Sequence, residues 1–231
     1  MRNIRKISFN IFLLLLFFCI AAYSGVVCLK KFTFDDIKGL DKWKKMILSG
    51  EVKYSLIRHG KEGYVKALSE KSCSSLYYRI GFKLKDYSIL KWKWKILQFP
   101  DISKARTEKE RDDYAARVYV IFPFLTFSSS KFIEYIWAED LPVGTIIDSP
   151  FGSNIKMIVV RKEMTPEGEW ATETRNVYED YIKVFGEKPR RNVGAIAIMC
   201  DADGTKTSAE SLFDNIIIET QESFEVKKEL E

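Results

Sequence analysis

Histidine is almost absent from this chain of 231 residues. The only one, His59, stands among glycines in the segment 59–63, whose composition predicts a turn. A multi-histidine metal site is therefore excluded, and a histidine-dependent catalytic triad is disfavoured.

An excess of charge of one sign is also missing. The whole chain carries +5, and residues 1–24 hold three basic and no acidic side chains, so the remainder carries only +2. Such a balance gives no field that would attract a polyanion, and we expect no nucleic-acid partner.

Cysteine is scarce and odd in number once the N-terminus is set aside. Cys28, Cys73 and Cys200 remain after residue 24, so at most one internal disulfide forms, and the spacing does not choose the pair. Cys200 alternates with Ile196 and Ile198, which predicts a small buried side chain.

A long membrane-spanning run is lacking too. The apolar stretch 11–22 follows three basic residues and ends in Ala22-Tyr23-Ser24, which is typical of a secretory signal over residues 1–24. It is shorter than the about 20 residues of a comfortable span, although an uncleaved anchor is the alternative. Neither Cys19 nor Cys28 follows a small residue, so no lipid anchor is predicted. The protein is expected to be periplasmic or secreted.

Alternating helices and strands are absent, which excludes an open parallel sheet. Period-two alternation instead predicts about eleven strands, and residues 177–185 form the one convincing short helix. Residues 25–220 are therefore predicted to be one all-β domain, a jelly-roll sandwich, followed by a polar tail over 221–231. The predicted strands are 32–36, 40–45, 52–58, 64–68, 76–84, 89–97, 114–124, 131–137, 156–161, 170–176 and the two arms of 195–219, with a loop over 141–154.

The stretch 195–219 is the centre of this pattern. Two alternating apolar arms flank an acidic loop that contains Asp201, Asp203, Gly204 and Thr205. The oxygens of Asp201, Asp203 and Thr205 suit calcium, and an Asp-rich turn without metal is the competing interpretation.

Several segments together resemble one family. They are ILKWKWKI, RDDYAARVYVIF, YIWAED, WATETRNVYEDYIKVFGEKP, IAIMCDADGT and SLFDNIIIE. They are similar to the domain-of-unknown-function 3047 family of bacterial exported proteins, which resembles galactose-binding-like sandwiches in outline. The family's usual Asp-x-Asp-Asn-Thr loop here has Gly204 in place of the asparagine.

Polar residues within apolar strands supply the candidate ligand-binding site. Arginines there need carboxylate partners, so one interpretation is a structural ion-pair network in which Arg117 and Arg175 each bind a carboxylate bidentately. A second is a saccharide cleft, because carboxylates and guanidinium groups bind hydroxyls and aromatic rings pack on sugar faces. The candidates are Arg117, Trp137, Glu173, Arg175, Asp180, Asp201 and Asp203.

A third interpretation is catalysis, with two carboxylates such as Glu173 and Asp201 acting on a glycosidic bond. The leading hypothesis is non-catalytic binding of a saccharide or a cell-envelope component. A glycan-cleaving hydrolase or lyase and a structural partner in an envelope assembly are the alternatives.

Overall fold

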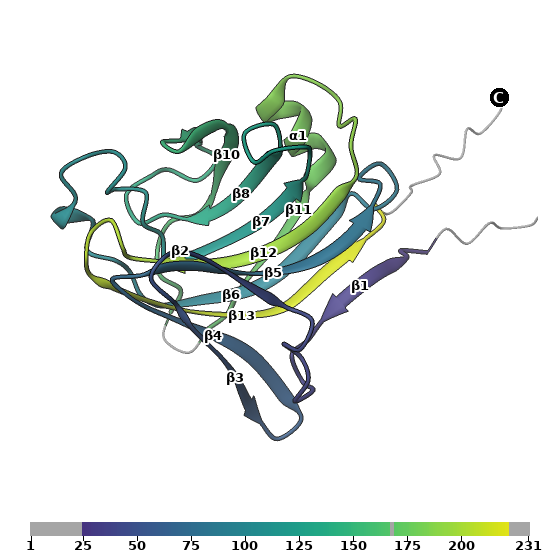
Figure 1. Ribbon diagram of the computed structural model, residues 1–231. Helices are drawn as coiled ribbons and strands as arrows, with labels where there is room; N and C mark the ends of the chain where they lie inside the picture. Colours follow the sequence, from purple (N-terminus) through teal and green to yellow (C-terminus); the bar gives the residue numbers. More distant parts are fainter. Residues whose placement is uncertain (1–24, 167–168, 222–231) are drawn as a thin grey trace, which may run out of the picture.

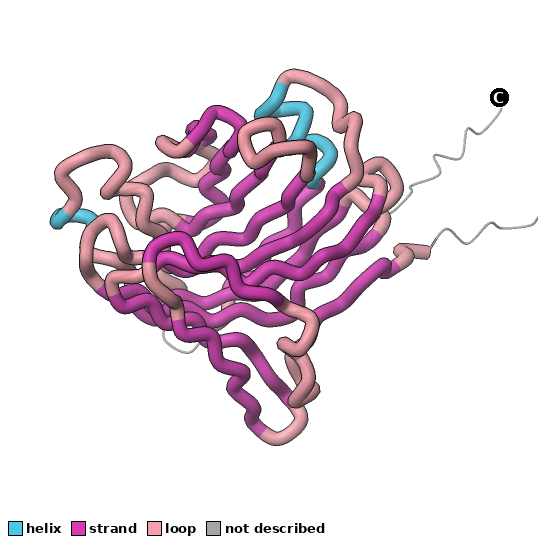
Figure 2. The backbone as a smooth tube through the Cα atoms, viewed as in Figure 1, coloured by secondary structure: helices cyan, strands magenta, loops and turns pink. Residues whose placement is uncertain are grey.

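Two β-sheets pack face to face in the computed structural model, which describes residues 25–166 and 169–221 (Figure 1). The predicted signal at 1–24 and the predicted tail beyond residue 221 lie outside the described residues. Strands dominate the trace, and helix appears in only two places within the described part (Figure 2). The predicted all-β sandwich with one short helix is confirmed.

The first sheet, sheet A, is antiparallel throughout, and its order is β11-β6-β13-β4-β3, with β1 pairing on β13. Its strands are β1 (Cys28–Phe32), β3 (Lys53–His59), β4 (Glu62–Glu70), β6 (Ile89–Gln98), β11 (Ala171–Asn176) and β13 (Ser208–Glu219).

The second sheet, sheet B, has the order β2-β5-β12-β7-β8-β10-β9, and only β8 and β10 run parallel. Its strands are β2 (Lys44–Ser49), β5 (Cys73–Phe82), β7 (Ala116–Phe122), β8 (Lys131–Trp137), β9 (Ile146–Ser149), β10 (Gly152–Arg161) and β12 (Val193–Asp201). Strands β12 and β13 belong to different sheets, so the acidic loop between them carries the chain from one layer to the other.

Strand β6 shows why the sheets stack. Leu90, Trp92, Trp94 and Ile96 are buried, whereas the lysines between them point to the other face, as alternation predicts. Trp92 and Trp94 pack against Tyr135 and Trp137 of sheet B, with ring centroids 5.2 and 5.4 Å apart. Aromatic contacts of this kind between the layers form much of the core.

The short helix α1 (Val177–Phe185) has the predicted bounds because both ends are capped. The Asn176 side chain accepts a hydrogen bond from the Glu179 backbone N–H at 3.3 Å, and Gly186 adopts the left-handed conformation that ends the helix. In the described part of the chain, no helix has the length and apolarity needed to cross a membrane.

Three local predictions were wrong. The opening strand ends at Phe32 rather than continuing to residue 36, because Phe34 has a φ of 56°, which lies in the left-handed region rather than the extended one. Hydrogen-bonded turns occupy residues 36–43, so the next strand begins only at Lys44. The expected loop over 141–154 contains β9, which pairs with β10.

Candidate functional site

A cleft of about 900 Å³ lies on the face of sheet B that points away from sheet A. Arg117, Tyr119 and Ile121 of β7 line it, whereas Val118 and Val120 between them belong to the core. Neighbouring strands contribute alternate residues in the same way, since side chains on a strand alternate between faces. The cleft residues from β5, β8 and β12 include Cys73, Ser75, Tyr77, Phe132, Glu134, Ala197, Met199 and Asp201.

Apolar side chains form the rim of the cleft. Met46 and Leu48 come from the edge strand β2 and are 46% and 61% exposed. Phe127 and Phe151 come from loops that flank β8 and β10, and they are 59% and 63% exposed. Exposed aromatic rings beside a hollow are typical of ligand contact rather than of fold stability.

Arg117 occupies the floor of the cleft and is nearly inaccessible to solvent. Its Nη2 donates to Asp201 Oδ2 at 2.5 Å and its Nε to Asp201 Oδ1 at 3.3 Å. Its Nη1 donates to Glu134 Oε2 at 3.0 Å and lies 3.4 Å from Asp112 Oδ1. One guanidinium thus serves three carboxylates, and the bidentate pairing predicted for Arg117 is confirmed.

Burial raises the pKa values of the carboxyl groups around Arg117. It raises the pKa of Asp201 to about 8 and that of Glu134 to about 7, while the nearby Arg117 charge lowers both. The pKa of Asp112 is raised for the same reason. A single buried cation does not compensate three buried anions, so the folded protein holds protons that an exposed carboxylate would release.

A pH dependence of stability follows from these shifts. Between pH 4 and pH 8 the folded state binds more protons than the unfolded state, so stability falls as the pH rises through this window. We expect the melting temperature to decrease from pH 5 to pH 8, and the decrease to be smaller in Asp201→Asn. Calorimetric melts of both proteins across this range measure how steeply the melting temperature falls with pH. If it falls equally in both, Asp201 does not cause the pH dependence.

Asp113, next to the cluster, holds the β12–β13 loop in place. Its carboxylate accepts hydrogen bonds from the backbone N–H of Gly204 at 3.1 Å and of Thr205 at 2.7 Å, and from the Thr205 hydroxyl at 2.6 Å. Thr205 therefore points toward Asp113 and Thr207, and its hydroxyl is already engaged.

Gly204 has a steric role in this loop. A Cβ added there would lie 2.5 Å from the backbone oxygen of Glu110. The charged segment 103–113 thus passes directly over Gly204, and a larger side chain at this position would displace that segment.

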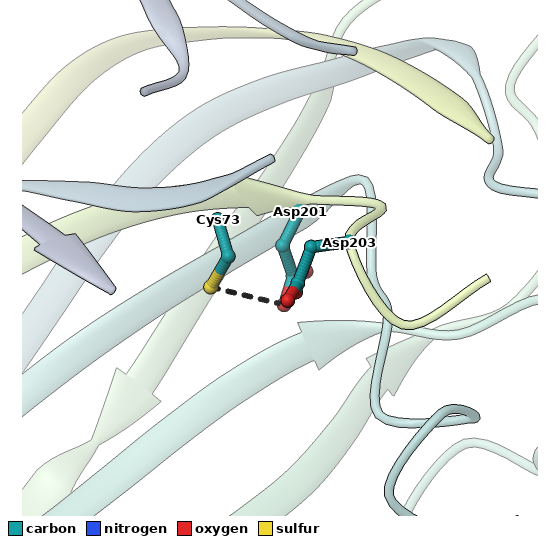
Figure 3. A group of neighbouring side chains, drawn as sticks. All are labelled: Cys73, Asp201 and Asp203. Carbon is teal, nitrogen blue, oxygen red and sulfur yellow. Dashed lines mark hydrogen bonds between the residues drawn. The ribbon is translucent and has the colours of Figure 1, made fainter. Parts of the chain in front are cut away.

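Cys73, Asp201 and Asp203 form a further group, whose sulfur and oxygen atoms lie within 4.8 Å of one another (Figure 3). The Cys73 thiol lies 3.9 Å from Asp201 Oδ2, and burial raises the pKa of this thiol far above its usual range. Of the predicted calcium ligands, Asp201 and Asp203 are thus brought together, with Cys73 rather than Thr205 beside them. The guanidinium on Asp201 opposes a cation bound directly to that carboxylate.

Four other candidates lie away from the cleft. Arg175 makes the predicted bidentate pair with Asp180, at 2.9 and 2.5 Å, and Tyr135 donates to the same carboxylate at 2.9 Å. Glu173 accepts from Arg161 Nε at 2.7 Å and from Trp94 Nε1 at 3.2 Å. Trp137 is fully buried among core aromatics, so no ring face is open to a ligand.

The structure therefore divides the predicted set. Arg117, Asp201 and Asp203 meet in the cleft, whereas Trp137, Glu173, Arg175 and Asp180 stabilise the sandwich elsewhere. Glu173 and Asp201, considered as an acid–base pair, belong to separate ion-pair clusters on different sheets.

Cleft residues that are not in the predicted set include Cys73, Ser75, Asp112, Phe127, Glu134 and Phe151. The sequence could have predicted the position of Glu134, because alternation along β8 puts it on the sheet face opposite Tyr135 and Trp137.

The chain belongs to the family described as Protein of unknown function (DUF3047), whose model matches residues 41–217. No curated protein matches the chain.

Similar solved structures include the CBM22-1 xylan-binding domain of Xyn10C from Paenibacillus barcinonensis, at 9% identity and a TM-score of 0.46, covering 87% of this chain and 100% of that one. The mannan-recognising carbohydrate-binding module TmCBM27 has 10% identity, a TM-score of 0.40 and coverages of 85% and 99%. The xyloglucanase domain of NopAA from Sinorhizobium fredii has 14% identity, a TM-score of 0.44 and coverages of 78% and 93%.

Proposed function

We propose that this protein is exported and binds a saccharide in the cleft of sheet B. The observation that carries the proposal is the pairing of a polar floor with aromatic walls in one hollow. Asp203 and Ser75 present hydroxyl-binding groups at the floor, and Phe127 and Phe151 offer exposed rings above it. Sugars need both, because their hydroxyls form hydrogen bonds and their C–H faces pack on aromatic rings.

The size of the cleft is in keeping with this role. Its volume of about 900 Å³ falls within the range of roughly 300–1,000 Å³ that is usual for small-molecule sites. The floor is also rigid, since Arg117 fixes the carboxylates around it and Asp113 fixes the loop that carries Asp203. A pre-formed site loses little entropy when a ligand binds.

Binding tests the proposal directly. The purified protein is titrated calorimetrically with neutral, amino and acidic oligosaccharides, and its thermal melt is followed in parallel. A ligand present at ~100 times its dissociation constant is expected to add about 2.7 kcal/mol of stability. Phe151→Ala is expected to weaken binding about tenfold, since a lost aromatic contact costs roughly 0.5–1.5 kcal/mol beyond area.

Phe124→Ala is the matched control, because Phe124 is also exposed but does not line the cleft. Equal losses in both variants, or no binding by any sugar, would reject the proposed function and direct attention to a protein partner in the envelope.

Glu134 favours cleavage of the ligand as a second candidate function. A carboxyl group with a pKa of about 7 in a cleft is suited to donate a proton at neutral pH. Chromatography of each sugar after incubation distinguishes the two functions: a binding module returns it intact, and an enzyme yields shorter products that Glu134→Gln no longer forms.

A further inference from the structure

The cleft on sheet B is polar at one end and apolar at the other. At the polar end Arg117 of β7 binds Asp201 of β12. At the apolar end Ile121 of β7 stands opposite Ala195 of β12, two strands that lie side by side in the sheet (Figure 1). The six steps along β12 from Ala195 to Asp201, at roughly 3.3 Å each, place the two ends about 20 Å apart.

The side chains of the apolar end have no hydrogen-bonding atoms. They come from four strands and from the loop after β7, and they are Ile121, Pro123, Phe127, Phe132, Ile155 and Ala195. Phe127 packs on Phe132 with ring centroids 4.9 Å apart, so the two rings form one wall. Arg79 stands opposite Ala195, but it is exposed and its guanidinium lies over the ring of Tyr77 at 6.0 Å. A sugar hydroxyl buried at this end would lose water without gaining a side-chain partner, which disfavours a sugar ring there.

Small side chains on β12 leave room for a narrow apolar group. Ala197 stands between Tyr77 of β5 and Tyr119 of β7, and Ala195 follows it on the same face. A row of small side chains between rows of large ones forms a trough that runs along the strand. The Tyr119 hydroxyl donates to Met199 Sδ at 3.1 Å, so it is already engaged. The trough therefore leads from the polar end to the apolar end and suits a hydrocarbon chain.

The loop after β7 is a second observation that points to an apolar group. Pro123 and Phe127 of this loop line the cleft. Leu125, between them, is 85% exposed, and Phe127 is 59% exposed. Large apolar side chains that are exposed beside a hollow usually mark a binding surface. The apolar surface of the cleft thus continues outward along this loop, past which a chain longer than the trough can leave.

We propose that the ligand of this cleft is an amphiphile, a saccharide that carries an alkyl or acyl chain. The sugar lies at the polar end near Asp203, and the chain lies over Ala197 and Ala195 toward Phe127. This inference rests on the proposed function and names the class of saccharide. Binding the chain removes apolar surface of both the ligand and the cleft from water, which a sugar alone cannot do at this end.

Glucosides that differ only in chain length test the inference. The full chain is titrated calorimetrically with methyl, hexyl and octyl β-glucoside below the concentrations at which they form micelles. We expect the affinity to rise about fourfold per methylene, since burying one CH₂ contributes ~0.8 kcal/mol, and therefore about sixteenfold from hexyl to octyl. The compound 1,2-octanediol carries the chain without the sugar, and it should bind at least tenfold more weakly than octyl glucoside.

Variants at the apolar end locate the chain. Ala195→Phe is expected to reduce the sixteenfold ratio of octyl to hexyl affinity to near one, because the added ring would occupy the trough. Phe127→Ser changes an exposed side chain and so has little effect on folding, and it should also lower the ratio. Phe124→Ser is the matched control, because Phe124 is an exposed residue of the same loop that does not line the cleft. It should leave the ratio unchanged.

Four outcomes would overturn the inference. Equal affinities of the three glucosides would reject it and leave saccharide binding standing. An unchanged ratio in both Ala195→Phe and Phe127→Ser would show that the chain binds outside the cleft. If 1,2-octanediol binds as tightly as octyl glucoside, the cleft does not recognise the sugar and the proposed function fails as well. If neither the oligosaccharides nor the glucosides bind, both proposals fail together.

Discussion

Replacing Arg117 by methionine is expected to lower the free energy of unfolding by about 3–5 kcal/mol, the usual cost of removing one partner from a buried ion cluster. Methionine fills most of the arginine's volume but provides no charge. Asp112, Glu134 and Asp201 would then remain buried side by side without a cation. The loss arises mainly from the uncompensated carboxylates rather than from packing.

Urea denaturation at pH 5 and pH 8 measures this effect and identifies its cause. The loss should be smaller at pH 5, where the raised pKa values of Glu134 and Asp201 leave both carboxyls protonated. Arg111→Met is the control, because Arg111 pairs with Asp140 on the surface, where both side chains are about half exposed. Its cost should not exceed ~1 kcal/mol. An equally small loss for Arg117→Met would show that the cluster is dispensable for folding.

Replacing Asp113 by alanine is expected to cost about 2–4 kcal/mol, because hydrogen bonds to a charged group contribute roughly 1.5–3 kcal/mol each and do not add fully. Asp113 is buried and accepts three hydrogen bonds from Gly204 and Thr205. Its removal leaves those donors without a partner and frees the loop that carries Asp203.

Asp113→Asn gives a graded comparison for this prediction. The amide keeps one acceptor oxygen, so a smaller loss than in Asp113→Ala is expected from thermal and urea unfolding. Ligand affinity should fall in Asp113→Ala even at temperatures where the protein is folded. Unchanged stability in both variants would mean that segment 103–113 holds the loop by packing alone.

Much of the fold can be predicted from the sequence because alternation is a local property. Leu90, Trp92 and Trp94 repeat at every second position, and such a pattern fits only a strand with one buried face. Helix α1 is equally local, with Asn176 and Gly186 at its ends. The strand bounds near Phe34 depend instead on a backbone angle that no side-chain pattern records.

The site is less predictable because it depends on which strands become neighbours. Alternation places Arg117, Tyr119 and Ile121 on one face of β7 but does not tell whether that face meets the core or the cleft. Arg117 and Arg175 have similar sequence surroundings. Arg117 lies near the start of β7, Arg175 lies near the end of β11, and acidic residues are close to both in the sequence. Only the pairing of β7 with β12 and β8 separates the arginine of the cleft from the arginine that anchors α1.

The crossing of the chain between β12 and β13 has a consequence for folding kinetics. The contacts that build the cleft floor join residues far apart in sequence: 84 positions separate Arg117 from Asp201, and 92 separate Asp113 from Thr205. Strand β1 pairs with β13, the last strand that the structure describes, so β1 joins sheet A only after β13 is present. Folds dominated by such distant contacts form slowly, typically in milliseconds to seconds. The cleft is therefore assembled only when nearly the whole chain is present, and a nascent fragment that ends before Val193 has no binding site to offer.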